Sequence, residues 1–263
     1  MSVSCNVCSG VVNKVFDEIV IKKYRVAYFK CSQCGFVQTE KPFWLDEAYA
    51  SSINLSDTGL VSRNIKMHKV VSLLLIFKYS LDGKFLDYGG GYGLFARLMR
   101  DYGFDFYTTD PNTPNLLARG FDYTGESEKR EIEFVTCFEC FEHFPNPKAS
   151  LEKILKISDN ILFSTEIIPD LTPQPSNWEY FGFNHGQHIS FYSRKSIYCL
   201  AGQYGLNAYS FRNIHLLTKK PFGLWVLPFV FICGRLGMSS IFKPFIKSRT
   251  VSDSIILGGK IKK

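Results

Sequence analysis

The N-terminal part of the chain carries four cysteines in two pairs whose spacing could hold a metal ion. Cys5 and Cys8 form one Cys-x-x-Cys pair and Cys31 and Cys34 form the other, with 22 residues between the pairs. Four thiolates give a tetrahedral zinc site with no open coordination position, so such a site is structural. A redox role would normally use one exposed pair. The two pairs therefore predict a zinc ribbon over residues 1–40.

A second group of polar residues follows an apolar segment in the middle of the chain. Glu139, Glu142 and His143 come directly after residues 132–137, which are predicted to form a strand. Two carboxylates and an imidazole could hold a divalent ion such as Mg²⁺ or Mn²⁺, and a bound ion acidifies an alcohol. The alternative is that Glu142 and His143 only stabilise the loop.

Two further histidines lie in a stretch that is dense in aromatic and polar residues, 178–193. Imidazole titrates near neutral pH, so His185 or His188 could act as a general base without any metal. His188 could instead contribute to the divalent-ion site. If neither role applies, the stretch is a packed aromatic loop whose histidines are satisfied within it.

A glycine-rich loop follows a short apolar strand. Asp87 lies on the strand, and Gly89, Gly91 and Gly93 alternate after it, before a predicted helix. Glycines allow positive φ and let the backbone approach a ligand closely. Open α/β sheets bind ligands at the carboxyl ends of their strands. The loop is therefore predicted to bind a cofactor.

Two kinds of cofactor compete for this loop. Gly91-x-Gly93-x-x-Ala96 matches the dinucleotide pattern, but two further glycines separate it from the strand. The other spacing is Asp87 followed by alternating glycines. A carboxylate so near the loop would repel a pyrophosphate but suits an ammonium group. Asp110, predicted at the end of the next strand, could accept hydrogen bonds from both ribose hydroxyls with either cofactor.

Alternating strands and helices must position these residues, and this alternation over 84–218 implies a parallel sheet with helices on both faces. Residues 221–248 are predicted to be a helical apolar insertion between the last two strands, and Ser252–Ile261 alternates like an edge strand. The predicted modules are a ribbon (1–40), a connector with a helix (41–83) and the catalytic domain (84–263). The strands are expected at 84–88, 106–109, 132–137 and 160–165, and the helices at 94–102, 148–157 and 193–204.

The acid on a strand followed by alternating glycines resembles the first motif of the class I S-adenosylmethionine (SAM)-dependent methyltransferases. The resemblance implies a Rossmann-like fold with a seven-stranded sheet, and SAM as the cofactor. Tyr49 could close over the cofactor or pack as a buried aromatic residue. Between Asp110 and Ile132 the acid that usually reads the adenine cannot be identified. The cofactor-binding residues that the resemblance implies are Asp87, Gly89, Gly91, Gly93, Asp110 and Tyr49.

Three further resemblances bear on the acceptor. Glu139-x-x-Glu142-His143 is similar to the metal-binding motif of ubiquinone-biosynthesis O-methyltransferases and small-RNA 2′-O-methyltransferases, in which a divalent ion contacts the acceptor hydroxyls. The ribbon resembles the N-terminal zinc module of deoxysugar methyltransferases. Residues 178–193 resemble a stretch of bacterial methyltransferases encoded with polysaccharide genes. The last two resemblances imply a sugar or capsule precursor as the acceptor, whereas the first, together with the ribbon, favours an RNA acceptor.

Composition and charge narrow the classes of partner and location. Hydrophobic residues make up 46% of the chain, enough for a core, and the net charge is +7. The basic excess near the C-terminus is either a solvated tail or an attraction to nucleotide-linked sugars, phosphates or a membrane surface. Without a signal sequence or an apolar run of about 18 residues, the expected location is the cytoplasm, with contact at the inner membrane face as an option. The late basic residues are Lys219, Lys220, Arg235, Lys243, Lys247, Arg249, Lys260, Lys262 and Lys263.

Three functions remain open from the sequence. The first is O-methylation of a small-molecule acceptor such as a sugar or polysaccharide precursor. The second is methylation of RNA, although the ribbon mixes both signs of charge instead of forming a basic stripe. The third is a non-catalytic binding module, against which the intact Asp87, glycine loop and Asp110 argue. The catalytic candidates are Glu142, His143, His185 and His188, and the divalent-ion candidates are Glu139, Glu142, His143 and His188.

Overall fold

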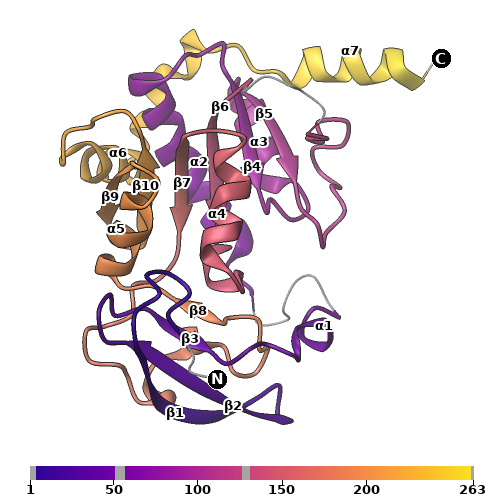
Figure 1. Cartoon of the computed structure of the whole chain (residues 1–263). Coiled ribbons are helices and arrows are strands. Elements are labelled where there is room, and N and C mark those ends of the chain that lie inside the picture. The colour runs from indigo at the N-terminus through magenta and orange to yellow at the C-terminus, as the bar shows by residue number, and fades with distance from the viewer. Residues whose placement is uncertain (1–3, 51–56, 126–130, 262–263) are drawn as a thin grey trace. The chain divides into compact units, whose positions relative to one another are not determined.

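The computed structural model describes residues 4–50, 57–125 and 131–261, with side chains through residue 258. Figure 1 labels the helices and strands and colours the chain by residue number. By compactness the chain divides into two units, each made of two separate stretches of sequence. Unit 1 contains Met1–Asn54 and Cys137–Pro221, and unit 2 contains Leu55–Thr136 and Phe222–Lys263. This division differs from the predicted modules, which stay a prediction. Residues 51–56 of the predicted connector and the basic residues Lys262 and Lys263 lie outside the described part.

A four-stranded antiparallel sheet in unit 1 has the order β1-β2-β3-β8. β1 (Val12–Val20) and β2 (Tyr24–Cys31) form a long hairpin, β3 (Val37–Thr39) pairs with β2, and β8 (Ser190–Phe191) pairs with β3. Their β-branched and aromatic residues suit a half-buried pleated surface. The buried cluster against this sheet includes Val26, Tyr28, Val37, Trp44, Phe181, Ile189 and Phe191.

The central sheet has the strand order β5-β4-β6-β7-β10-β9. The strands of unit 2 are parallel, whereas β10 of unit 1 is antiparallel to both β7 and β9. The predicted α/β class, a mostly parallel sheet flanked by helices, is confirmed, but the described residues supply six strands where seven were expected. The bounds are β4 (Lys84–Tyr88), β5 (Asp105–Thr109), β6 (Ile132–Phe138), β7 (Asn160–Ser164), β9 (Asn207–Phe211) and β10 (Ile214–Thr218).

The helices begin and end at residues that explain their limits. α3 begins after Gly93 and ends before Gly103, whose φ of 133° no other residue adopts easily. α4 is capped by Asn146, whose side chain accepts a hydrogen bond from the Ala149 amide. α5 has a capping box formed by Ser193 and Ser196. The helices are α1 (Leu45–Ala48), α2 (Leu60–Lys78), α3 (Leu94–Tyr102), α4 (Pro147–Leu155), α5 (Arg194–Gly202), α6 (Val226–Arg235) and α7 (Thr250–Ile261), with 3-10 turns η1 (Phe141–His143), η2 (Pro175–Asn177), η3 (Glu179–Phe181) and η4 (Met238–Phe245).

The expected edge strand at Ser252–Ile261 is wrong, because these residues form α7. Asp253 is buried and accepts hydrogen bonds from Nε and Nη2 of Arg100 at 2.8 and 2.7 Å. One turn later, Leu257 lies against Gly120. Residues 253 and 257 share a helical face, which faces the rest of the unit. The long-range ion pair between Arg100 and Asp253 therefore outweighs the local alternation of apolar residues.

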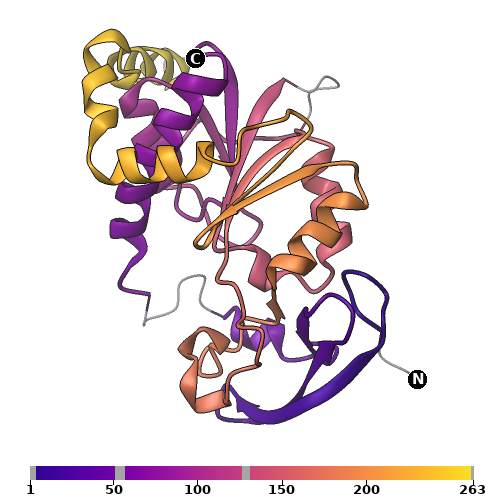
Figure 2. The ribbon, with the colours of Figure 1, turned by 90° about the vertical axis from the view of Figure 1, so that its left-hand side faces the viewer.

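The apolar segment 221–248 does not lie between the last two strands either. β9 and β10 form a hairpin through Arg212, whose φ is 55°, and both precede the segment. The segment forms α6, which packs along α2 (Figure 2), and η4. Among the described residues no single helix is long and apolar enough to cross a membrane, although α6 and η4 meet that composition together across an 85° bend.

Candidate active site

The loop after β4 has the backbone shape that its glycines predicted. Gly91 and Gly93 have φ values of 55° and 81°, which other residues rarely adopt. A side chain at Gly93 would collide with Asn115, whereas one at Gly91 would meet no atom of the described residues within 4 Å. The backbone at Gly91 therefore borders open space, as a cofactor loop requires.

Asp87 is held below this loop. It is only 3% exposed, and one of its carboxylate oxygens accepts a 2.7 Å hydrogen bond from the Thr136 hydroxyl. Burial raises the pKa of Asp87 to about 7; the Thr136 hydroxyl acts in the opposite direction, and the nearby Asp110 carboxylate raises the pKa further. A cationic ligand group at this carboxylate would compensate the cost of its burial.

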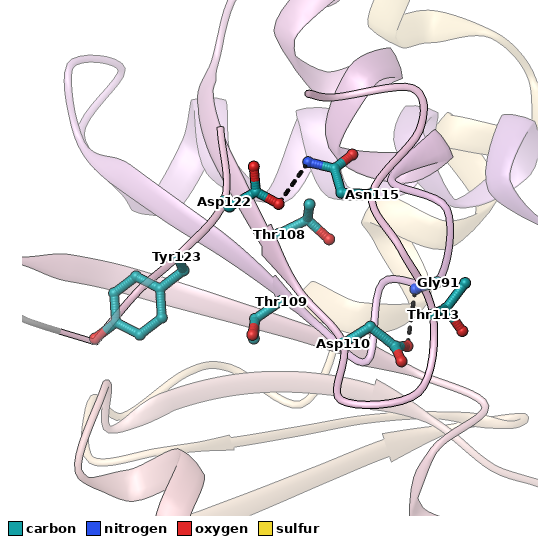
Figure 3. Close-up of a pocket in the computed structure, with 8 residues that line it drawn as sticks. All are labelled: Gly91, Thr108, Thr109, Asp110, Thr113, Asn115, Asp122 and Tyr123. Atoms are coloured by element: carbon teal, nitrogen blue, oxygen red, sulfur yellow. Dashed lines mark hydrogen bonds between the residues drawn. The ribbon is translucent and has the colours of Figure 1, made fainter. Parts of the chain in front are cut away.

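Asp110 follows β5 and closes the other side of the loop. Its Oδ2 accepts a 3.0 Å hydrogen bond from the Gly91 amide, and its Oδ1 accepts one of 2.8 Å from the Asn112 amide. A small pocket with a cavity volume of about 90 Å³, open to solvent, lies beside this carboxylate (Figure 3). It is lined by Gly91, Thr108, Thr109, Asp110, Thr113, Asn115, Asp122 and Tyr123.

Asp122 is a pocket residue that the sequence analysis missed. Residues 121–123 run parallel to β5 through a single bridge between Thr108 and Asp122, flanked by backbone hydrogen bonds. Asn115 donates a 3.0 Å hydrogen bond to the Asp122 carboxylate, which keeps it at the pocket (Figure 3). The signal was the acid between two aromatic residues, Phe121 and Tyr123, but one bridge is too short to show a strand pattern.

A second polar cluster lies within unit 1. Glu142, His143 and His188 each offer a ligand atom, and these three atoms all lie within 4.8 Å of one another. The 3-10 turn η1 carries the first two residues. The backbone amide of Ile189 donates to the Glu142 carbonyl oxygen at 2.9 Å, so the segment bearing His188 is fastened to η1. The structure thus brings together three of the four residues that the sequence offered as divalent-ion ligands.

The hydrogen bonds of the two histidines fix which nitrogen carries the proton. Nδ1 of His188 lies 2.6 Å from the Tyr180 carbonyl oxygen, and Nδ1 of His143 lies 3.1 Å from the Gln187 carbonyl oxygen. A carbonyl oxygen only accepts, so each Nδ1 donates and each neutral ring keeps its lone pair on Nε2. Both Nε2 atoms are then able to accept a proton or bind a metal ion.

Burial shifts the pKa values of all three cluster residues toward their neutral forms. Burial, with repulsion from Glu139, raises the pKa of Glu142 to about 8, while the Tyr180 and Thr165 hydroxyls act in the opposite direction. Among the residues that the structure describes, neither buried carboxylate oxygen of Glu142 has a hydrogen-bond partner of normal geometry. Burial and repulsion between the rings lower the pKa of His143 to about 4 and that of His188 well below its ordinary value.

The remaining catalytic and metal candidates lie around this cluster. Glu139 has a φ of 50° and accepts a hydrogen bond from Ser164, so it does not join the three-residue group. The Nδ1 of His185 accepts a 3.2 Å hydrogen bond from the Gln187 amide, so its neutral ring carries the proton on Nε2. Tyr49, expected at the cofactor, has its hydroxyl 2.9 Å from Nδ1 of His143.

The four N-terminal cysteines come together as predicted. The Sγ–Sγ distances are 3.6 Å for Cys5 and Cys34 and 3.4 Å for Cys8 and Cys31, and all four sulfurs lie within 4.8 Å of one another. A tetrahedral zinc site with bonds of about 2.3 Å needs sulfurs about 3.8 Å apart. The Val7 and Cys34 amides point at sulfurs of the cluster, at 3.4 and 3.5 Å. The arrangement fits a four-thiolate metal site.

A comparison with models of known protein families shows to which family the chain belongs. A family model described as a methyltransferase domain matches residues 64–210, more than half of the chain. The chain belongs to this methyltransferase family. The matched region contains the glycine loop, Asp110, Asp122 and the cluster of Glu142, His143 and His188. No curated protein sequence matches the chain.

Solved methyltransferase structures are similar to this methyltransferase only at low identity. Magnesium protoporphyrin IX methyltransferase from Synechocystis PCC 6803 with bound SAH is 14% identical, with 66% of this chain and 90% of that chain covered and a TM-score of 0.45. The plantazolicin methyltransferase in complex with SAH is 11% identical, with coverage of 74% and 82% and a TM-score of 0.46. Human N-acetylserotonin methyltransferase with SAM is 13% identical, with coverage of 68% and 66% and a TM-score of 0.43. Because these TM-scores are below 0.5, the assignment rests on the family model.

Proposed function

We propose that this methyltransferase uses SAM to methylate a hydroxyl group of a small-molecule acceptor, such as a sugar or polysaccharide precursor. The observation that carries the cofactor assignment is the bond from the Gly91 amide to Asp110 beside an open pocket. It fixes a carboxylate next to a loop that exposes its backbone. When bound, SAM supplies an activated methyl group.

The carboxylates around the loop fit SAM better than a dinucleotide. Asp110 would accept hydrogen bonds from the ribose hydroxyls, and Asp122 would accept one from the amino group of adenine. Asp87 would face the ammonium group of the methionine part. Three carboxylates on this pocket and the strand beneath it would repel the pyrophosphate of a dinucleotide. Asp122 would thus be the acid that contacts adenine, which could not be identified from the sequence.

Acceptor activation is assigned to the cluster in unit 1. In the general-base form of the proposal, Nε2 of His188 takes the proton of the acceptor hydroxyl as the methyl group is transferred. In the metal form, Glu142, His143 and His188 hold a divalent ion that acidifies the hydroxyl. One carboxylate and two imidazole nitrogens suit Mn²⁺ better than Mg²⁺, which prefers an all-oxygen set.

The four-cysteine cluster is proposed to hold a structural zinc ion. Its four sulfurs leave no coordination position for a substrate, and three of the cysteines are buried. In the small antiparallel sheet of unit 1, the metal would fix the two loops that carry the cysteine pairs.

The proposal is tested by a transfer screen with methyl-labelled SAM. The chain is incubated with nucleotide-linked sugars, polysaccharide precursors, cell extract and total RNA, and labelled products are identified by mass. Label on a hydroxyl of a sugar-containing molecule supports the proposal. Label on RNA would instead support RNA methylation, the second function left open by the sequence. No labelled product from any source, under conditions where SAM binds, would contradict a catalytic role.

A further inference from the structure

The outward face of α6 is apolar, although its inward face is already packed. Trp225, Phe229, Ile232 and Leu236 are all exposed, and their spacing of four, three and four residues places them on one side of the helix. Trp225 and Leu236, at the two ends of the row, are 63% and 74% exposed. An exposed apolar stripe of this kind lowers solubility and typically marks a binding surface.

The inward face of α6 cannot turn to hide this stripe. Val226, Val230 and Cys233 are buried, and α6 packs along α2 in the same unit. A side chain at Gly234 would lie 2.9–3.0 Å from atoms of Val70, so the two helices approach closely. The exposed row is therefore a fixed feature of unit 2 and not a badly packed core face.

Further exposed apolar side chains lie on the segments that precede and follow α6. Leu224 precedes it, and Ile241 and Phe245 of η4 follow it after the 85° bend. Phe77 of α2 is also exposed, and its ring packs against the rings of Phe229 and Phe242 at 6.0 and 5.6 Å. We call this set the α6–η4 surface: Phe77, Leu224, Trp225, Phe229, Ile232, Leu236, Ile241 and Phe245.

The charges within this segment are almost all positive. The only acid between residues 222 and 258 is Asp253, which is buried and paired with Arg100. Arg235 and Lys247 are exposed and have no carboxylate within ion-pair distance among the described residues. Lys78 lies 5.9 Å from the ring centre of Trp225. The apolar row is thus bordered by cations that have no acidic neighbour on the same segment.

We propose that the α6–η4 surface binds the interface of an anionic lipid bilayer. Apolar and aromatic side chains would enter the boundary of headgroups and acyl chains, while Arg235 and Lys247 would meet lipid phosphates. A second copy of the chain is the poorer partner, because a two-fold contact through this surface would bring like charges together without an acid to pair them. The proposal does not depend on the identity of the acceptor or on SAM binding.

The test is sedimentation of the full chain with vesicles of phosphatidylcholine alone or mixed with phosphatidylglycerol. The wild type is expected to sediment with the mixed vesicles, and less so as salt is raised. Trp225→Ser combined with Leu236→Ser should lower the partition coefficient by about tenfold or more. Arg235→Gln combined with Lys247→Gln should lower it by about tenfold at low salt and remove most of the salt dependence.

Two control variants change similar residues outside this surface. Leu171→Ser removes another highly exposed leucine, and Lys41→Gln with Lys156→Gln removes two exposed cations; both should sediment like the wild type. The proposal is overturned if the wild type sediments with neither kind of vesicle, or if the Trp225 and Leu236 changes leave sedimentation unaltered. Self-association of the wild type that those changes abolish, with no vesicle binding, would assign the surface to a second copy instead.

Discussion

The backbone amide of Gly91 donates a 3.0 Å hydrogen bond to Oδ2 of Asp110. This bond joins the loop after β4 to the residue after β5, so the two parallel strands present one continuous edge to the pocket. The second oxygen of Asp110 is held by the Asn112 amide. The carboxylate is therefore oriented before any ligand arrives, which lowers the ordering cost of binding.

Replacing Asp110 should weaken cofactor binding without unfolding the chain. In Asp110→Ala the ribose hydroxyls lose a charged acceptor, a change of about 1.5–3 kcal/mol that corresponds to about a tenfold to hundredfold weaker dissociation constant. Calorimetric titration with SAM measures it. The matched control is Asp82→Asn, an exposed acid outside the pocket, which should bind like the wild type. Equal binding by Asp110→Ala and the wild type would remove Asp110 from the site.

The buried carboxyl of Asp87 should make stability fall as pH rises. Its pKa is about 7 in the folded chain and near 3.8 in the unfolded chain, so between these values the folded state binds more protons. The contribution is fully present below about pH 4 and is lost by about pH 7, an effect of about 4 kcal/mol. As the pH rises from about 4 to about 7, the wild type should therefore lose unfolding free energy relative to Asp87→Asn.

A second variant checks the cause of that pH dependence. Thr136→Val removes the hydroxyl that lowers the Asp87 pKa, so the loss of stability should extend to higher pH. Denaturant unfolding at a series of pH values measures both variants. If the stability difference between Asp87→Asn and the wild type is constant from pH 4 to 8, Asp87 does not titrate as a buried carboxyl.

The tautomers of the histidines predict unequal effects on turnover. His188→Ala should lower kcat by about a hundredfold to ten-thousandfold, because Nε2 of His188 can take a proton. His185→Ala should lower it by less than about tenfold, because the proton on Nε2 of His185 leaves no lone pair for this role. The readout is kcat on the acceptor found in the transfer screen. Equal losses in the two variants would contradict the assignment of the base.

Chelation separates the two forms of acceptor activation. If a divalent ion is used, EDTA should abolish turnover, and Mn²⁺ or Mg²⁺ but not Zn²⁺ should restore it. If His188 acts without an ion, turnover should survive chelation that leaves the four-cysteine site loaded. Loss of turnover in Glu142→Gln fits the metal form. Unchanged turnover in both Glu142→Gln and His188→Ala would make the cluster structural.

The cysteine cluster should contain one zinc ion per chain. Removing it with a strong chelator should unfold the hairpin of β1 and β2 and lower the thermal stability, while the SAM dissociation constant changes little, because the pocket residues belong to unit 2. Elemental analysis and SAM titration of the same sample measure both effects. A content far below one zinc per chain in freshly purified protein would contradict the assignment of a structural zinc site to the four cysteines.

The parts of the fold that the sequence predicted are those set by local signals. The strand with Asp87, the glycine loop and α3 follow one another within a short stretch, so apolar runs and glycines were enough to place them. Glu142 and His143 stand together in the motif that the family resemblance supplied, and His188 was offered separately as a further ligand or as a general base.

The parts that the sequence missed depend on distant contacts. The alternating apolar residues of α7 predict a strand, but Arg100, 153 residues away, holds Asp253 in a helix. Asp122 was missed because a single bridge to Thr108 leaves no periodic pattern. Glu139 was expected among the metal ligands, but its positive φ and its bond with Ser164 keep it out of the three-residue group.

Direct titration of the wild type and Gly91→Val with SAM and with NAD tests the proposal that the loop containing Gly91 binds SAM. A valine would be strained at the positive φ of Gly91, and its side chain would enter the open space beside the pocket. The wild type should bind one SAM per chain and should not bind NAD, and Gly91→Val should bind SAM at least about a hundredfold more weakly. Binding of NAD in preference to SAM, or equal SAM binding by the wild type and the variant, would contradict it.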